Sequence, residues 1–106
     1  MTQEDKDYCD LKTVLKLKSL GMNVYTSFKG IDVIKNISAY EVLKWLRKNH
    51  NIYIVVFIDD DTDKPVTFEI YKGTEYIMRE HSYYSLAEWN KAEMDAIEYV
   101  LDNDVI

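Results

Sequence analysis

The strongest constraint on the fold is an uninterrupted run of seven apolar residues, IYIVVFI, at positions 52–58. The run is rich in β-branched and aromatic side chains, which favour the extended backbone of a strand. Because a strand that is apolar on both faces is normally buried on both, we expect 52–58 to be a central strand of a sheet. Seven residues are too few to cross a bilayer, which takes about 20 residues in a helix.

The segments after this run continue the sheet. Apolar and polar side chains alternate over residues 65–72 (PVTFEIYK), which predicts a strand with one face in the core. Gly73 and Thr74 then form a tight turn, and we expect a third strand in EYIMREHS, residues 75–82. Together the three segments predict an antiparallel meander.

Three segments have the start and stop signals of helices. Asp10 is a candidate N-cap for a first helix that stops at Gly21. Ser38 and Ser85 are each followed three residues later by a glutamate, the capping box that begins a helix. We expect the buried face of the last helix to consist of Leu86, Trp89, Ala92, Ala96, Ile97 and Val100.

The segment between the first two helices, residues 22–37, shows no clean period. We expect an irregular connector there, with a short strand at 23–28 as an alternative. A chain of 106 residues is one domain by length, and we expect residues 1–8 to be disordered. The predicted fold is α+β: two N-terminal helices, a three-stranded antiparallel β-meander and a C-terminal helix packed on one face of the sheet.

Charge is unevenly distributed along the chain. The net charge is −6, yet residues 10–50 carry eight basic and three acidic side chains, and residues 51–106 carry 13 acidic and four basic. Such a chain is a poor match for DNA or a membrane surface, because phosphate binding needs clustered lysine and arginine. It suits a partner that is itself basic. A single cysteine, Cys9, allows no internal disulfide and fits a cytoplasmic location.

An acidic cluster follows the apolar run and consists of Asp59, Asp60, Asp61 and Asp63. An EF-hand calcium loop has oxygen ligands at positions 1, 3 and 5, glycine at 6 and glutamate at 12. Here position 6 is Lys64 and position 12 is Ile70, so the two most demanding positions do not fit. We interpret the cluster as a polar hairpin turn, with a looser calcium or magnesium site, or contact with a basic partner, as alternatives.

Motifs for catalysis and for metal binding are missing from the sequence. It has no glycine-rich phosphate loop, GxSxG or HExxH. His50 and His81 are 31 positions apart and form no zinc motif, and Cys9 has no neighbouring base. We therefore expect a protein that is not an enzyme and that uses no metal or cofactor.

Aromatic side chains gather in two places. Tyr83 and Tyr84 precede the last helix, and Trp45 lies in the second. Tyrosine and tryptophan are enriched at protein interfaces, although in a small domain they also cap the core. Close to Trp45 are three basic residues, Lys44, Arg47 and Lys48. Base stacking beside these cations would make a weak nucleic-acid or nucleotide-binding module, which is the alternative function.

Two segments also suggest an origin. In SAYEVLKWLRKNHNIYIVV a helix with a Lys-Trp-Leu-Arg run leads into a strand, and in SYYSLAEWNKAEMDAIEYVL a Ser-Tyr start leads into an alanine-rich helix. The positions concerned are Lys44, Trp45, Leu46, Arg47, His50, Ile52, Ser82, Tyr83, Ala92, Ala96 and Leu101. Over residues 38–102 this combination resembles small uncharacterised proteins of bacteriophages and of mobile elements in gut bacteria. Trp89 stands where that family more usually has a small residue.

The resemblance implies a phage or mobile-element origin but transfers no functional residue, because the family has no assigned activity. Small acidic proteins of such origin are often inhibitors of host defence, including anti-CRISPR proteins. We therefore expect a non-enzymatic acidic interaction protein that binds the basic surface of a host nucleic-acid-handling complex. The expected partner-binding residues are Asp59, Asp60, Asp61, Asp63, Tyr83, Tyr84, Glu93, Asp95, Glu98 and Asp102.

Overall fold

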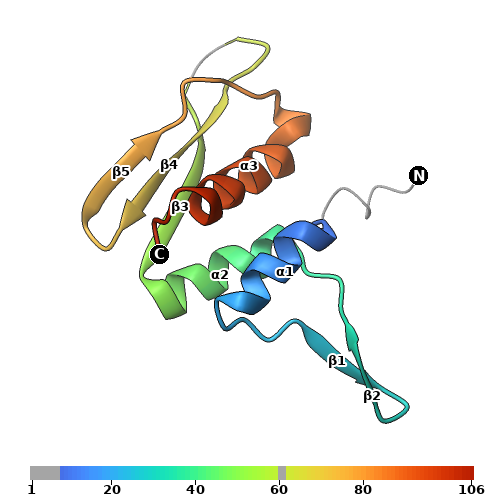
Figure 1. Ribbon diagram of the computed structural model, residues 1–106. Helices are drawn as coiled ribbons and strands as arrows, with labels where there is room; N and C mark the ends of the chain where they lie inside the picture. The colour runs from blue at the N-terminus through green and yellow to red at the C-terminus, as the bar shows by residue number, and fades with distance from the viewer. Residues whose placement is uncertain (1–7, 60–61) are drawn as a thin grey trace.

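The computed structural model describes residues 8–59 and 62–106 and shows the predicted α+β architecture (Figure 1). The helices of this part of the chain are α1 (Leu11–Ser19), α2 (Ala39–His50) and α3 (Trp89–Asp102). The predicted meander is formed by β3 (Ile52–Ile58), β4 (Val66–Lys72) and β5 (Glu75–Arg79). A second sheet consists of β1 (Tyr25–Phe28) and β2 (Ile31–Ile34), and a 3₁₀ turn, η2 (Leu86–Glu88), precedes α3.

Helix starts follow the predicted caps. Asp10 Oδ1 accepts a hydrogen bond from the Thr13 backbone N–H at 2.9 Å, and Ser38 Oγ accepts one from Glu41 N–H at 3.2 Å. At Ser85 the backbone N–H donates to Glu88 Oε1 at 3.0 Å, which is the glutamate half of the predicted capping box. These side chains satisfy amides that have no partner within the first turn of a helix.

The predicted packing of the C-terminal helix on the sheet is confirmed. Val66, Phe68 and Ile70 of β4 are buried in one core with four residues of α3: Ala92, Ala96, Ile97 and Val100. The prediction for Leu86 is wrong, since its side chain is 59% exposed. The capping box closes a 3₁₀ turn before α3 begins, so Leu86 does not follow the 3.6-residue period of the helix. Trp89 is half-buried.

The expected central position of residues 52–58 is also wrong. The strand order is β3-β4-β5, so β4 lies at the centre and β3 at an edge. Helix α3 contacts β3 and β4 on one face, while Tyr53 and Val55 on the other are 39% and 42% exposed. Apolar side chains on both faces therefore do not identify a central strand here, because one face stays uncovered by the described residues.

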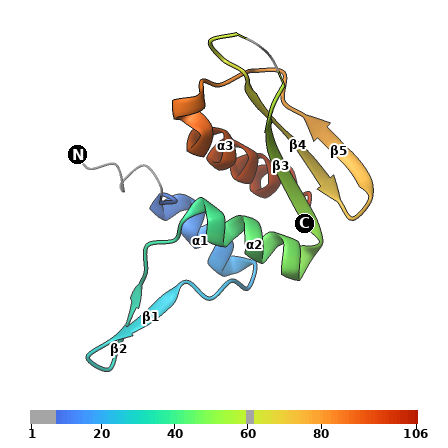
Figure 2. The ribbon, with the colours of Figure 1, turned by 180° about the vertical axis from the view of Figure 1, so that it is seen from behind.

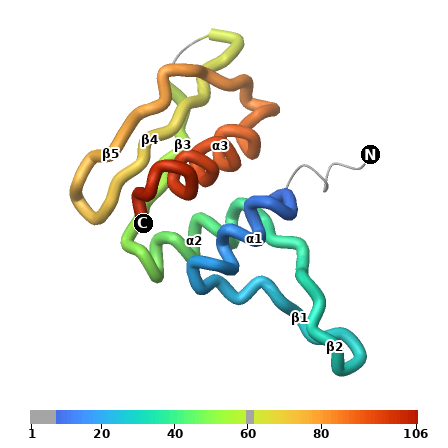
Figure 3. The backbone as a smooth tube through the Cα atoms, viewed as in Figure 1, coloured from blue at the N-terminus to red at the C-terminus, as the bar shows by residue number. Residues whose placement is uncertain are grey.

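The connector at 22–37 contains a regular hairpin rather than irregular chain. Its two-residue turn, Lys29 and Gly30, has φ values of 51° and 78°, which are typical of a type I′ turn. This turn usually carries Asn-Gly, and a lysine in the first position conceals the signal. Figures 1 and 2 show the hairpin projecting from the helices, and the tube in Figure 3 shows the same path. We call residues 25–34 the arm.

The start of the described chain is tied to the second helix. Of the segment 1–8 that we expect to be disordered, only Tyr8 is described, and it forms an isolated antiparallel bridge with Ser38. The Cys9 backbone N–H donates to the Ile37 carbonyl at 2.8 Å. The chain therefore enters α1 alongside the residues that cap α2.

Candidate protein-binding surface

Asp59 and Tyr83, two of the predicted partner-binding residues, lie together at the end of β3. The Tyr83 hydroxyl donates to Asp59 Oδ2 at 2.8 Å, and the Arg79 guanidinium forms an ion pair with the same carboxylate oxygen. The guanidinium carbon of Arg79 also lies 5.3 Å from the centre of the Phe57 ring. The hydrogen bond to Tyr83 and the nearby Asp59 carboxylate raise the pKa of Arg79 above its usual value. This cluster joins β3, β5 and the segment before α3.

The other three residues of the aspartate cluster do not join Asp59 in this contact with Tyr83 and Arg79 as far as the described residues show. Asp60 and Asp61 lie outside the described residues, and Asp63 is exposed. Lys64 donates its backbone N–H to the Thr62 hydroxyl at 3.2 Å, as in the polar turn that the sequence predicts. Among the described residues no group of three histidine, cysteine or acidic side chains is placed to hold a metal ion.

Tyr84 links the sheet to α3. Its backbone pairs with Val66 through hydrogen bonds of 2.8 and 3.0 Å, and its hydroxyl donates to Asp95 Oδ2 at 2.7 Å. Lys91 Nζ lies 3.1 Å from the same oxygen. Burial, and then the bond to Asp95, raise the pKa of the Tyr84 hydroxyl above its usual value. Tyr84 is therefore a buried residue that joins the sheet to α3, and Asp95 is its partly exposed partner.

The acidic residues of α3 have different surroundings. Asp102 forms an ion pair with Lys16 of α1, and this contact lowers the pKa of its carboxyl group. Glu98 is exposed and Glu93 is half-buried. Since Asp59, Asp95 and Asp102 each contact a cation of the same chain, the predicted carboxylates do not form one uncompensated acidic surface.

A surface that the sequence analysis did not single out covers the side of the sheet away from α3. The strand registers place one set of side chains there, and we call it the open face: Tyr53, Val55, Phe57, Thr67, Glu69, Tyr71, Tyr76 and Arg79. Thr67 is fully buried, and its hydroxyl donates to the Glu80 carbonyl at 2.9 Å. Tyr76 is 53% exposed, more than Tyr53 or Val55. The Tyr71 and Tyr76 rings meet edge-to-face at 5.7 Å, and the Tyr71 hydroxyl donates to Glu69 Oε1 at 3.1 Å. The signal available in the sequence was the uninterrupted apolar run of 52–58, which places apolar side chains on both faces of the strand.

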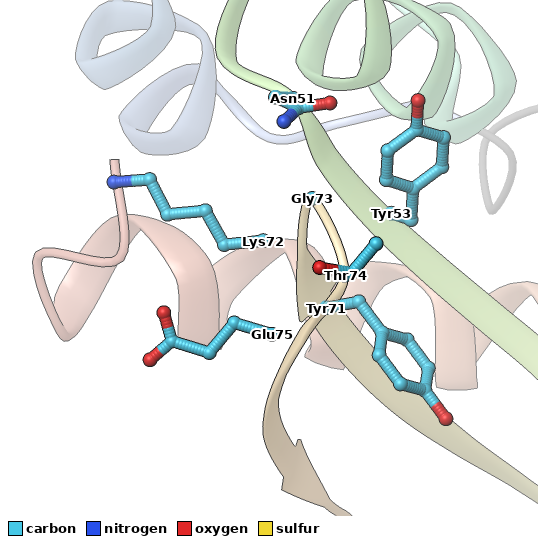
Figure 4. A pocket seen from close by; sticks show the side chains of 7 residues that line it. All are labelled: Asn51, Tyr53, Tyr71, Lys72, Gly73, Thr74 and Glu75. Carbon is cyan, nitrogen blue, oxygen red and sulfur yellow. The ribbon is translucent and has the colours of Figure 1, made fainter.

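A hollow of about 870 Å³ surrounds the β4–β5 turn and is lined by residues from both sides of the sheet. Figure 4 shows Tyr53 and Tyr71 pointing to one side of the strands and Lys72 and Glu75 to the other. Gly73 is in the left-handed conformation, with φ of 61°, and its N–H donates to the Asn51 carbonyl at 2.7 Å. This bond fixes the turn against the end of α2, so the hollow has a defined wall.

The residues of the alternative function lie elsewhere. Lys44, Trp45 and Lys48 border a largely apolar hollow of about 450 Å³ between α2 and the end of α1. Arg47 is exposed but is not among the residues that line this hollow. The Trp45 ring packs edge-on against His50, with 4.7 Å between ring centres. The structure thus joins two of the three predicted cations to the aromatic ring.

The remaining candidate, Cys9, is half-buried rather than exposed. Its thiol lies 3.8 Å from the Met94 sulfur, and burial is the main cause that raises the pKa of Cys9 to about 11. A thiol that stays protonated at neutral pH is a poor nucleophile.

Comparisons with family models, with curated proteins and with solved structures found no match to this chain. Within residues 8–59 and 62–106, the helices are all too short or too polar to traverse a bilayer.

Proposed function

We propose that this chain is a non-enzymatic interaction protein that binds a partner protein through the open face. The observation that carries the proposal is the exposure of Tyr53, Val55 and Tyr76 on a rigid sheet whose other face is covered by α3. Aromatic residues on a rigid scaffold contribute large contact area at a small cost in conformational entropy. The tyrosine hydroxyls add hydrogen-bonding groups at the edge of that area.

The charge of the whole chain, −6, favours a basic partner. On the open face Glu69 stands opposite Arg79, and Asp63 is exposed beyond the end of β3. Complementary charges would speed association and fix the orientation of the complex. As a class of target we propose a host nucleic-acid-handling defence complex, whose basic surface would be occupied in place of DNA or RNA.

A direct test uses an interference assay in a CRISPR-bearing bacterial host, with and without expression of the protein. Expression should relieve interference, and the substitution Tyr76→Ala should weaken this effect at least tenfold while leaving the melting temperature within a few degrees. Tyr40→Ala is the matched control, because Tyr40 is 68% exposed on α2. Equal loss in both variants, or no relief of interference by the intact protein, would refute the proposal.

The charge contribution needs a separate measurement. Binding to the captured complex should weaken as salt rises, since interactions between exposed charges are screened. Glu69→Gln should reduce this salt dependence. Binding that is insensitive to salt would remove the electrostatic part of the proposal and leave only the aromatic contacts.

The hollow beside Trp45 supports a second candidate function, weak binding of nucleic acid or nucleotide. The observation that supports this second candidate is that Lys44 and Lys48 border the same apolar surface as the indole ring of Trp45. We expect a Lys44→Ala/Arg47→Ala/Lys48→Ala variant to lose binding to a fluorescent single-stranded oligonucleotide at low salt. If the intact protein does not bind at low salt, this candidate is wrong.

A further inference from the structure

Backbone hydrogen bonds between β3 and β4 come from the odd-numbered positions of β3. At one end of the strand the Asn51 carbonyl accepts from the Gly73 N–H at 2.7 Å, and at the other end the Asp59 N–H donates to the Pro65 carbonyl at 2.8 Å. The register between these ends is continuous, and backbone groups alternate in direction along an antiparallel strand. The even-numbered positions therefore direct their N–H and C=O groups to the opposite edge, where no described strand lies.

This outer edge of β3 is covered at one end and open over the rest. Ile52 is fully buried, and the end of α2 and the C-terminus lie beside that end of the strand in both views (Figures 1 and 2). Ile58 at the other end is 61% exposed, and Ile54 and Val56 are half-buried. We call residues 54–58 the free edge. It offers a row of donors and acceptors at strand spacing, which another extended backbone can match.

The two edges of the sheet differ in the features that prevent pairing. Natural edge strands are guarded by charged side chains, proline, bulges or short length. β5 has five residues, carries Glu75 and Arg79, and shifts its register against β4. β3 has seven residues, none of them charged and none a proline. The contrast indicates that pairing with another strand is prevented at β5 and permitted at β3.

We propose that the partner protein adds an extended segment to the free edge, as a fourth strand of the sheet. The inference rests on the proposed function and deepens it, because a strand added here would widen the open face. In such an arrangement main-chain hydrogen bonds supply the affinity, and side chains at alternate positions supply the specificity.

The surroundings of the free edge define the chemistry of that segment. Residues directly opposite Ile54, Val56 and Ile58 would lie on the α3 side of the sheet, against these apolar side chains. The alternate residues would lie beside Val55 and Phe57, at the border of the open face. The net charge of −6 favours basic side chains there, so the expected segment alternates apolar and basic residues.

A second copy of this chain is the competing occupant, and the covered end of β3 disfavours it. Paired along the same residues, a copy would bring either its β3–β4 turn or its own α2 against the end of the strand where Ile52 is buried. Both copies would also carry a net charge of −6, which opposes self-association. A short segment of a basic partner meets neither obstacle.

An NMR titration of the labelled full chain tests the inference, with a blocked seven-residue peptide in which valine and lysine alternate as the probe. The amide resonances of Ile54, Val56 and Ile58 should shift saturably, with a dissociation constant on the order of 1 mM or below. Methylating the backbone nitrogens of the valines removes the donors that face β3, and should weaken binding at least about fivefold. Methylating those of the lysines leaves these donors in place and should not. The inference is overturned by a titration without saturable shifts, by equal effects of the two methylated peptides, or by the same shifts when the protein is concentrated alone.

A protein variant separates this inference from the proposed function. Ile58→Lys adds a charge of the kind that guards natural edges, and should weaken peptide binding at least about fivefold. Ile31→Lys is the matched control, because Ile31 is an isoleucine of β2 that is 65% exposed. In the interference assay Ile58→Lys should weaken relief as Tyr76→Ala does. Relief that depends on Tyr76 and not on Ile58 would overturn the inference and leave the proposed function standing. If the intact protein gives no relief, the proposed function fails, and the titration still decides whether the edge accepts a strand.

Discussion

Replacing Tyr84 with phenylalanine isolates one hydrogen bond between the sheet and α3. The side chain is 7% exposed, and the variant keeps its ring contact with Phe68, whose ring centre is 6.4 Å away. A hydrogen bond to a charged acceptor contributes about 1.5–3 kcal/mol. Asp95 keeps Lys91 and is 34% exposed, so its carboxylate is not left buried alone. We therefore expect Tyr84→Phe to lower the free energy of unfolding by about 1.5 kcal/mol, the lower end of that range. This loss corresponds to a fall in melting temperature of roughly 6–9 °C.

The pH dependence of this difference gives a second test. The pKa of Tyr84 is raised in the folded state, so its contribution is complete below the unfolded value, about 10, and is lost as the pH rises above it. The phenylalanine variant has no such loss. The difference in unfolding free energy between the intact protein and this variant should therefore become smaller above pH 10. The difference in unfolding free energy between the two proteins can fall by at most about 1.4 kcal/mol per pH unit. We expect a smaller fall, because the hydroxyl bonds to a carboxylate that is partly exposed to solvent.

Urea denaturation at several pH values measures both effects, with Tyr40→Phe as a control that should change the free energy of unfolding by less than about 0.3 kcal/mol. A cost below about 0.5 kcal/mol for Tyr84→Phe at pH 7 would show that the bond does not anchor α3. A gap that stays constant from pH 7 to 11 would refute the reasoning about proton linkage.

Three further predictions concern separate elements. Gly73→Ala should destabilise the protein by about 1–2 kcal/mol in urea denaturation, because φ is 61° and a Cβ would lie 2.9 Å from Asn51 Nδ2; a neutral result would mean that the turn can relax. Lys29→Asn should slow amide exchange within the arm about fivefold, since asparagine tolerates the left-handed conformation, while leaving the global melting temperature unchanged. Cys9 should react with a thiol reagent at pH 8 about 100-fold more slowly in the folded than in the unfolded chain, because its pKa rises from 9.0 to about 11; equal rates would contradict the burial argument.

Sequence patterns that span a single turn or strand determined much of this protein. Asp10, Ser38 and Ser85 begin helical turns where their spacing predicts, because a cap needs only an oxygen two or three residues before an unpaired amide. The alternation in β4 likewise predicts the burial of Val66, Phe68 and Ile70, because successive residues of a strand point to opposite faces. It does not predict the burial of Thr67 on the other face, whose hydroxyl donates to the Glu80 carbonyl at 2.9 Å.

The tertiary structure alone decided which elements became neighbours. The order of the strands makes β3 an edge and leaves Tyr53 and Val55 exposed, although its sequence is apolar on both faces. Pairing across the chain places Arg79 beside Asp59 and Lys16 beside Asp102, which compensates carboxylates that in sequence read as one acidic group. Such contacts join residues 20 to 86 positions apart, and no local pattern encodes them. Local propensity chooses the elements, while burial and long-range pairing choose the surfaces that remain available for binding.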